Sequence, residues 1–301
     1  MIKFKTGMSG AEALFIAAFL FATTNVLVRE MAHMWGDQAQ IAARFILVWL
    51  LLVGYGYARK TKASIPKNKQ WHVVALSVLF VLAILFFTLS VQKTTIANTL
   101  FMAYASTLVT ASFLGTIVLK ERLTRRKLIA ISLSLLGLAF YSGAILDGNE
   151  GIIFGILGGM TAATTNLIAK QLAGVNRSAI LRVQFGIGAL LALISTLVFS
   201  SHDILRAVSF EGTMATIVFA LILIAGSHLI LYGYKHIDVN IGSVISSSEL
   251  IFGAVLGLLL FQEVPAVHEI MSGLLIGLGA IIGSGGQKKV TDQDAITLSQ
   301  A

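Results

Sequence analysis

Glu249 is a carboxylate in the middle of a long apolar stretch of this 301-residue chain. The 25 residues Val239–Glu263 are almost unbroken apolar and small side chains. As an α-helix that rises ~1.5 Å per residue, they are long enough to cross a hydrocarbon core of ~30 Å. An ionised carboxylate at that depth costs at least ~2.5 kcal/mol, so it is usually neutral, paired, or facing water inside a helix bundle. Glu249 is therefore a candidate for binding a proton or a substrate. The alternative is a protonated side chain that only hydrogen-bonds to a neighbouring helix.

The residues around Glu249 predict that it faces the inside of the protein. Positions 242, 246, 249, 253 and 257 hold Gly, Ser, Glu, Gly and Gly. Their three- and four-residue spacing puts them on one face of a helix. This narrow polar stripe exposes the backbone, so it is expected to face other helices rather than lipid. Ser246 is a second candidate on the same stripe.

The stretch around Glu249 has an earlier copy, 142 residues before it. At this shift four residues recur, namely Asn98 and Asn240, Ser106 and Ser248, Gly115 and Gly257, and Glu121 and Glu263. Thr107 occupies the position of Glu249 in this copy, and Tyr104 lies one helical turn before it. Both are further candidates for the same site.

A second pair of segments repeats more closely. Residues 22–25 and 163–166 both read ATTN, and each is followed four residues later by a base, Arg29 and Lys170. Because a spacing of four puts amide and base on one helix face, Asn25 and Asn166 are candidates for facing walls of one cavity. The alternative for the asparagines is hydrogen bonding between helices. The bases are expected to extend from the helix ends to the lipid headgroups.

Two further titratable side chains lie inside predicted spans. Arg44 lies about six residues into the second span, and its planar guanidinium suits a carboxylate or a phosphate. The alternative is a structural pair with a carboxylate or a helix C-terminus. His228, near the inner end of the eighth span, could titrate near neutral pH and is otherwise a hydrogen-bonded packing residue.

Helix ends and close helix contacts are also predicted from the sequence. Glu121 and Glu263 shortly precede Thr124 and Pro265, which are good first residues of a helix, so both are expected to cap the helix that follows. Small residues four apart predict close approach of helices at Gly253/Gly257, Ala111/Gly115, Gly273/Gly277 and Gly279/Gly283.

Composition excludes a water-soluble globule. Hydrophobic residues make up 56% of the chain and charged residues 12%, against roughly 25% charged in a soluble domain. The net charge of +8 does not indicate a nucleic-acid partner, because the bases are distributed among loops. The chain has no cysteine, which excludes disulfides and Cys-ligated metal centres. It also has no phosphate loop, zinc motif or nucleophile elbow, so neither cofactor nor metal is predicted.

The sequence predicts an all-α integral membrane protein with ten transmembrane helices as two inverted five-helix repeats. Residues 1–146 form the first repeat, 151–286 the second, and 287–301 a polar cytoplasmic tail. The predicted spans are about 13–28, 38–58, 71–92, 96–119 and 128–146, then 151–169, 179–199, 213–234, 239–262 and 266–286. Because each repeat has an odd number of spans, the second copy enters the membrane in the opposite orientation. Such repeats commonly build transporters with a site near the midplane.

The distribution of bases predicts the orientation. With both termini cytoplasmic, the inner segments hold 18 Lys and Arg residues and the outer segments only three, Arg29, Lys93 and Arg206. The positive-inside rule therefore favours cytoplasmic N- and C-termini.

The motifs, in this order and twice over, resemble the EamA-like transporters of the drug/metabolite transporter superfamily. The resemblance covers nearly the whole chain and rests on FATTNVLVRE and AATTNLIAKQ, on Ala43-Arg44-Phe45, and on the endings LGTIVLKERLT and LGLLLFQEVPA. It implies ten spans as two inverted units and secondary transport of small metabolites, frequently export of amino acids, from a central cavity lined by both halves. The family often has Glu-Pro in the middle of the ninth span, where this chain has Glu249-Leu250, so no proline breaks the span here.

The sequence thus favours a secondary transporter, not an enzyme, in the plasma (inner) membrane of a prokaryote. It would export a small metabolite such as an amino acid by alternating access, with protons as a candidate coupling ion. The alternative within transport is a nucleotide-sugar or phosphosugar exchanger, which the scarcity of bases inside the spans disfavours. A membrane-embedded enzyme needs a cluster of titratable groups, and only Glu249 and His228 offer one. The expected partners are the lipid bilayer and the substrate, without nucleic acid, and the oligomeric state is open between monomer and homodimer.

Overall fold

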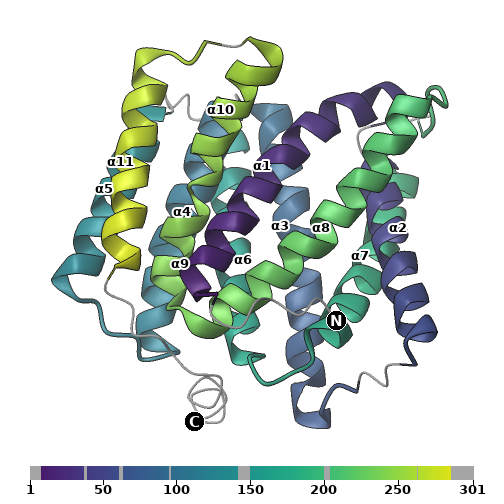
Figure 1. Ribbon diagram of the computed structural model, residues 1–301, viewed down its shortest axis with the longest axis horizontal. Helices are drawn as coiled ribbons and strands as arrows, with labels where there is room; N and C mark the ends of the chain where they lie inside the picture. Colours follow the sequence, from purple (N-terminus) through teal and green to yellow (C-terminus); the bar gives the residue numbers. More distant parts are fainter. Residues whose placement is uncertain are drawn as a thin grey trace.

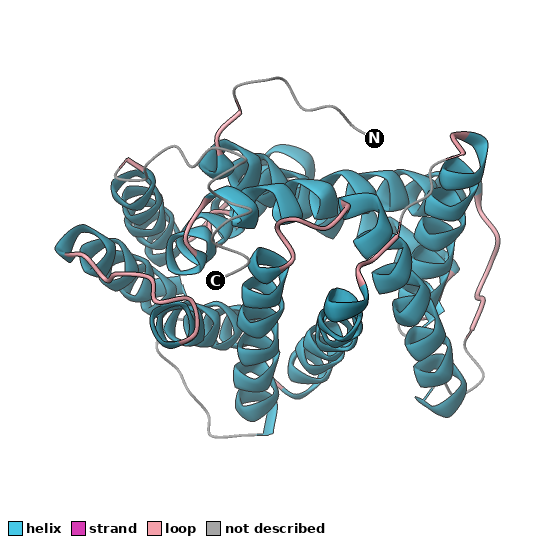
Figure 2. Ribbon diagram, turned by 90° about the horizontal axis from the view of Figure 1, so that it is seen from below, coloured by secondary structure: helices cyan, strands magenta, loops and turns pink. Residues whose placement is uncertain are grey.

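The computed structural model describes residues 8–36, 39–60, 64–94, 96–141, 150–199, 204–262 and 264–285, without the side chains of Arg29, Ala97 and Phe199. Within these ranges the chain is helical and has no β-strand beyond one isolated bridge, between Trp35 and Leu205 (Figure 2). The long helices lie side by side and cross one another at an angle (Figure 1).

The helices follow the predicted spans closely. They are α1 (Gly10–Met34), α2 (Ala39–Ala58), the short 3₁₀ helix η1 (Lys67–Lys69), α3 (Gln70–Lys93), α4 (Ile96–Ile117), α5 (Arg125–Tyr141), α6 (Glu150–Gln171), α7 (Arg177–Phe199), α8 (Phe210–His236), α9 (Val239–Ser246), α10 (Glu249–Phe261) and α11 (Val267–Ser284). A Ser9–Glu12 capping box begins α1, and Ser209 accepts a hydrogen bond from the backbone N–H of Gly212 to begin α8.

Nine helical segments of the described chain are long and apolar enough to cross a membrane. The fifth predicted span, 128–146, corresponds to α5, which has 17 residues and is too short to count among the nine. The predicted end of this span falls in residues 142–149, outside the described part of the chain. The count of ten spans therefore stays a prediction.

The ninth predicted span is broken, although the sequence has no proline there. The helix α9 ends at Ser246, and α10 begins at Glu249. The two residues between them, Ser247 and Ser248, have ψ angles of −13° and −12°, close to the 3₁₀ range. Their hydroxyls donate to the carbonyls of Val244 and Ile245. The missing proline put a helix break here in doubt, but the helix is interrupted at these two serines, and residues 239–261 together still form one candidate span.

The helix packing pairs the two halves of the chain. The most extensive contacts join α1 to α8, α3 to α6, α4 to α6 and α5 to α11. Under the repeat shift, α1 corresponds to α6 and α3 to α8, so the first two contacts are counterparts of each other. The helix α2 likewise packs on its own counterpart, α7. Figure 1 shows α5 and α11 together at one edge of the molecule and α2 and α7 at the other.

Glycines allow one of these contacts to be very close. A Cβ at Gly137 of α5 would lie 2.9 Å from the carbonyl oxygen of Ser272 in α11, and one at Gly279 would lie 2.8 Å from that of Ala130. Gly283 lies against the same helix, as its spacing from Gly279 predicts. Gly253, by contrast, has open space around it, so the small-residue spacing there does not mark a helix contact.

The outside of the bundle is apolar, as lipid contact requires. Large hydrophobic side chains such as Phe113, Leu197 and Leu259 are more than half exposed. Exposed apolar surface on this scale is unusual for a soluble monomer and normal for helices that face acyl chains. The chain is therefore a multi-pass membrane protein in contact with the lipid bilayer.

Candidate functional site

A cavity of about 400 Å³ lies between the two halves of the chain. Helices α1, α3 and α4 of the first half and α6 to α10 of the second all contribute to its wall. Its polar lining residues are Asn25, Tyr104, Thr107, Thr165, Asn166, Gln184, Ser227, Ser243, Ser246 and Glu249. Six of the eight residues that the sequence suggested for a site lie in this wall.

Glu249 and Tyr104 join the two halves across the cavity. The Tyr104 hydroxyl, on α4, donates to Oε2 of Glu249, on α10, at 2.8 Å. The helix break after Ser246 places Glu249 at the first residue of α10, where a carboxylate interacts favourably with the helix dipole. The carboxyl therefore has a hydroxyl donor and a helix N-terminus beside it, and it still lines the cavity.

Asn25 and Asn166 both lie in the cavity wall, on α1 and α6. Within the described residues, neither side-chain amide has a hydrogen bond to another residue of the protein. Each amide is thus available to a molecule in the cavity. Both asparagines therefore stay candidates for a role in the cavity, which is a prediction.

The hydroxyl residues of the wall differ in how they are held. Thr107, the repeat counterpart of Glu249, donates to the carbonyl of Ala103 in its own helix and also approaches that of Gly159 in α6, at 3.1 Å. Ser246 lies 3.5 Å from the hydroxyl of Tyr234. Thr107 therefore ties α4 to α6 more than it faces a ligand.

Sequence reasoning did not single out four of the polar lining residues, Thr165, Gln184, Ser227 and Ser243. For Gln184 a signal was present, because it occupies in the second half the position that Arg44 has in the first. For Thr165 a signal was also present, because it lies within the repeated ATTN segment 163–166. Ser227 and Ser243 are small hydroxyl residues, which are common in membrane helices and carry no distinctive pattern.

Arg44 and His228 lie elsewhere. The guanidinium of Arg44 lies 4.7 Å from the ring centre of Phe219, a cation–π contact, and its Nε has no hydrogen-bond partner among the described residues. His228 lines a separate hollow of about 350 Å³ at the start of α7, together with Arg177 and Lys235. Neither residue lines the central cavity.

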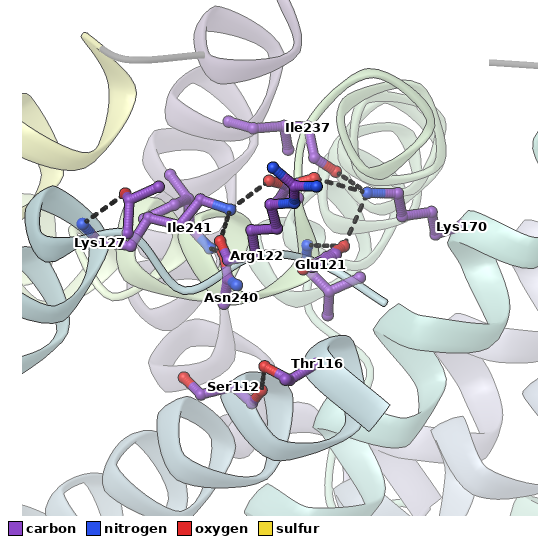
Figure 3. A network of polar contacts seen from close by, with 12 residues as sticks. Ser112, Thr116, Glu121, Arg122, Lys127, Lys170, Ile237, Asn240 and Ile241 are labelled. Atoms are coloured by element: carbon purple, nitrogen blue, oxygen red, sulfur yellow. Dashed lines mark hydrogen bonds and ion pairs between the residues drawn. The ribbon is translucent and has the colours of Figure 1, made fainter. Parts of the chain in front are cut away.

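Charged side chains around Lys170 form a network of ion pairs and hydrogen bonds (Figure 3). Ala169 lines the cavity, and Lys170 follows it at the end of α6. The Lys170 ammonium lies 2.7 Å from Glu121, just past the end of α4, and 3.2 Å from Asp238, between α8 and α9. Lys127 of α5 pairs with the other oxygen of Asp238. The ends of α4 and α6 and the starts of α5 and α9 thus meet at four charged side chains, and these helices come from both halves of the chain.

Burial makes this network stronger than a surface ion pair. The Glu121 side chain is 4% exposed and that of Lys170 is 18% exposed. Burial alone would raise the pKa of Asp238, but Lys170 and Lys127 together hold it below the ordinary value of an aspartate. The contribution of Asp238 to the stability of the folded protein is therefore fully present at any pH above the ordinary pKa of an aspartate. It is lost only as the pH falls through the lower pKa that Asp238 has in the folded protein. Asp238 therefore keeps its charge throughout the neutral range.

The network corrects two expectations from the sequence. Lys170 does not extend to the headgroups, because two carboxylates hold it inside the protein. Glu121 does not cap α5. Its carboxylate instead accepts a hydrogen bond from the backbone N–H of Val239, at the start of α9 in the other half. Thr124 caps α5 by accepting from the backbone N–H of Lys127. Glu263, the repeat partner of Glu121, lies outside the described residues.

A membrane protein whose described part is helical, with a partly open cavity that carries polar side chains between its two related halves, has the architecture of a polytopic transporter. The chain matches the EamA-like transporter family twice, over residues 8–143 and 149–284, and it belongs to that family. A protein of Archaeoglobus fulgidus described as an uncharacterized transporter is 21% identical over 286 residues, which cover 94% of this chain and 98% of the relative. A crystal structure with 16% sequence identity superposes with a TM-score of 0.74, covering 91% of this chain and 98% of the other, and it has the same fold.

Proposed function

We propose that this membrane transporter is a secondary active transporter, an exporter of a small metabolite such as an amino acid, that works by alternating access. The observation that carries the proposal is the cavity between the halves, in which Tyr104 of one half binds Glu249 of the other. A carboxyl in a cavity away from bulk water can take up a proton on one side of the membrane and release it on the other. We propose Glu249 as the group that couples transport to a proton gradient.

The proposal includes a membrane arrangement. The two halves are inverted five-helix repeats, 1–146 and 151–286, with α5 as the tenth span. The chain lies in the plasma membrane of a prokaryote with both termini in the cytoplasm. The counterpart contacts of α1 with α8 and α3 with α6 support the repeat, and the excess of bases in the predicted inner segments supports the orientation.

The buried charges around Lys170 serve as the closure of the cavity on the cytoplasmic side. They join the ends of α4 and α6 to the starts of α5 and α9 directly beyond Ala169. Because the ion pairs bridge the two halves, a movement of one half against the other has to break them. Breaking these ion pairs opens the cavity toward the cytoplasm, and forming them closes it.

Counterflow in proteoliposomes tests the proposal. Purified protein is reconstituted with a panel of amino acids, amines, sugars and sugar phosphates inside, and entry of the labelled solute is followed with and without a pH gradient. Transport of at least one small solute, accelerated by the gradient, is expected. Folded protein that transports no member of the panel, or whose transport ignores the pH gradient, would contradict the proposal.

A further inference from the structure

Among the described lining residues of the cavity, the one charged side chain is acidic. Glu249 is a carboxylate, and the part of the wall that the structure describes contains no Lys, Arg or His. The nearby base Lys170 is held by Glu121 and Asp238, and Arg44 lies over Phe219. The only direct partner of the Glu249 carboxyl in the described chain is the neutral hydroxyl of Tyr104.

A carboxylate in this setting favours a cation. Away from bulk water, an ionised carboxyl without a counter-charge is costly and becomes neutral by binding either a proton or a cationic group. An anionic solute would add a second negative charge to the same enclosed space. Each phosphate or carboxylate that enters needs a base in the wall, and the described wall has none.

The rest of the wall suits an organic cation with an apolar body. The rings of Phe21, Phe80 and Phe87 line the same cavity as Glu249, with aliphatic side chains between them. Aromatic faces attract an ammonium group within ~6 Å of the ring centre and pack against apolar carbon. The volume of about 400 Å³ lies in the range of ~300 to 1,000 Å³ that small-molecule sites have.

We propose that the cavity binds a monocationic amine with an apolar or aromatic body and no carboxylate of its own, with its ammonium on Glu249. This inference rests on the proposed transport function and narrows its substrate from metabolites in general, amino acids included, to amines. Asn25 and Asn166 offer neutral hydrogen-bonding groups to the rest of the molecule. The amine of a zwitterionic amino acid can pair with Glu249. Its carboxylate then finds no basic side chain among the described lining residues.

Three compounds with the same ring and chain separate these charge types. Phenethylamine has only the amine, 3-phenylpropionate has only the carboxylate, and phenylalanine has both. Binding is measured by the rise in melting temperature of the detergent-purified protein, since a ligand that binds only the folded state raises it. Transport is measured by counterflow, with protein-free liposomes as the control for leakage of the neutral amine.

Phenethylamine is expected to bind about tenfold more tightly than the other two compounds, the difference that a hydrogen bond between charged groups gives. Glu249→Gln is expected to remove this preference. The control Glu150→Gln, which removes an exposed carboxyl, is expected to leave the preference unchanged. If Glu249→Gln does not fold, Glu249→Asp, which keeps a carboxylate on a shorter side chain, is expected to bind phenethylamine more weakly and still prefer it over 3-phenylpropionate, and a preference for 3-phenylpropionate in this variant overturns the amine assignment.

The outcomes separate the inference from the function on which it rests. Binding of phenylalanine as tight as that of phenethylamine, or a preference for 3-phenylpropionate, overturns the amine assignment and leaves a transporter of another substrate. Failure of all three to bind, with transport of a sugar or a sugar phosphate, overturns it as well. Tight binding of phenethylamine without transport of any solute supports the amine site and contradicts the transport function.

Discussion

At the scale of single residues, Glu249 combines a carboxyl that can gain or lose a proton with a position in the cavity between the halves. Its hydroxyl donor, Tyr104, comes from the other half, so any relative movement of the halves alters the surroundings of the carboxyl. In the proposed function, protonation of Glu249 and the opening of the cavity are linked through this hydrogen bond. This link makes Glu249 the most direct target for substitution.

Glu249→Gln keeps the size of the side chain and removes its titration. We expect the variant to lose accumulation driven by a pH gradient by about tenfold or more, because the coupling proton has no group to bind. Exchange at equal pH and saturating solute should continue. The assay is uptake into proteoliposomes with an imposed gradient, and Glu150→Gln, which removes a carboxyl that is 73% exposed, is the matched control. If uptake by Glu249→Gln depended on the pH gradient as it does in the wild type, another group would couple transport to protons.

Asn25→Ala and Asn166→Ala remove amides that have no hydrogen-bond partner among the described residues. No protein group is left unpaired, so the folded yield should stay close to that of the wild type, while transport falls several-fold, by roughly the 1 kcal/mol of one lost neutral hydrogen bond to the solute. Size-exclusion chromatography and counterflow measure the two effects separately. A loss of folded yield in both variants would instead make the asparagines packing residues.

Individual residues show why only part of the site could be predicted from the sequence. Glu249, Asn25 and Asn166 stand out because polar groups are costly in an apolar span, or because they recur in the repeat. Arg44 is equally conspicuous in the sequence, yet a cation–π contact with Phe219 holds it away from the cavity. That contact depends on which faces of α2 and α8 meet, and helical spacing within one span does not determine it.

At the scale of helices, the charges that join α4, α5, α6 and α9 form the proposed cytoplasmic closure. Removing one partner of a buried ion pair leaves the other charge unpaired, at a cost of about 3 kcal/mol or more. Lys170→Gln and Glu121→Gln are therefore expected to weaken the closed state. A cysteine at Ala169, which is 3% exposed, reports on this opening.

We expect Lys170→Gln to increase labelling of Ala169→Cys by an impermeant maleimide several-fold from the cytoplasmic side. Lys93→Gln, which breaks an exposed pair with Glu150, is the matched control and should leave the labelling unchanged. Because Lys170 and Lys127 lower the pKa of Asp238, the labelling rate of Ala169→Cys, divided by that of an exposed cysteine at the same pH, should not vary over roughly pH 6 to 8. Unchanged labelling in both Lys170→Gln and Glu121→Gln would show that the network does not close the cavity.

The helices could be predicted from hydrophobic length alone, since a span needs about 20 apolar residues wherever it lies. Their ends and breaks could not, because these depend on local hydrogen bonds. The ninth span, for example, is interrupted at Ser247 and Ser248, where the sequence has no proline. Glu121 likewise caps a helix far along the chain, a contact that only the folded structure brings about.

At the scale of the whole molecule, the proposed orientation rests on the distribution of bases in the sequence. In this cysteine-free chain, a cysteine at Glu150 should react with an impermeant maleimide from outside intact cells, and one at Lys67 should not. Both side chains are exposed at the surface, so access is decided by the side of the membrane. The reverse labelling pattern would contradict the proposed orientation, and labelling of both cysteines from outside would contradict the proposed number of spans.

The central claim is that one cavity opens alternately to the two sides of the membrane, and a cysteine at Ala162 in its wall tests this most directly. The variant is prepared in right-side-out and in inside-out vesicles, and its labelling by an impermeant maleimide is measured in each after its transport has been verified. Alternating access predicts labelling from both sides, with transported solute protecting the cysteine in each case. Labelling from one side only, in protein that still transports, would contradict the account.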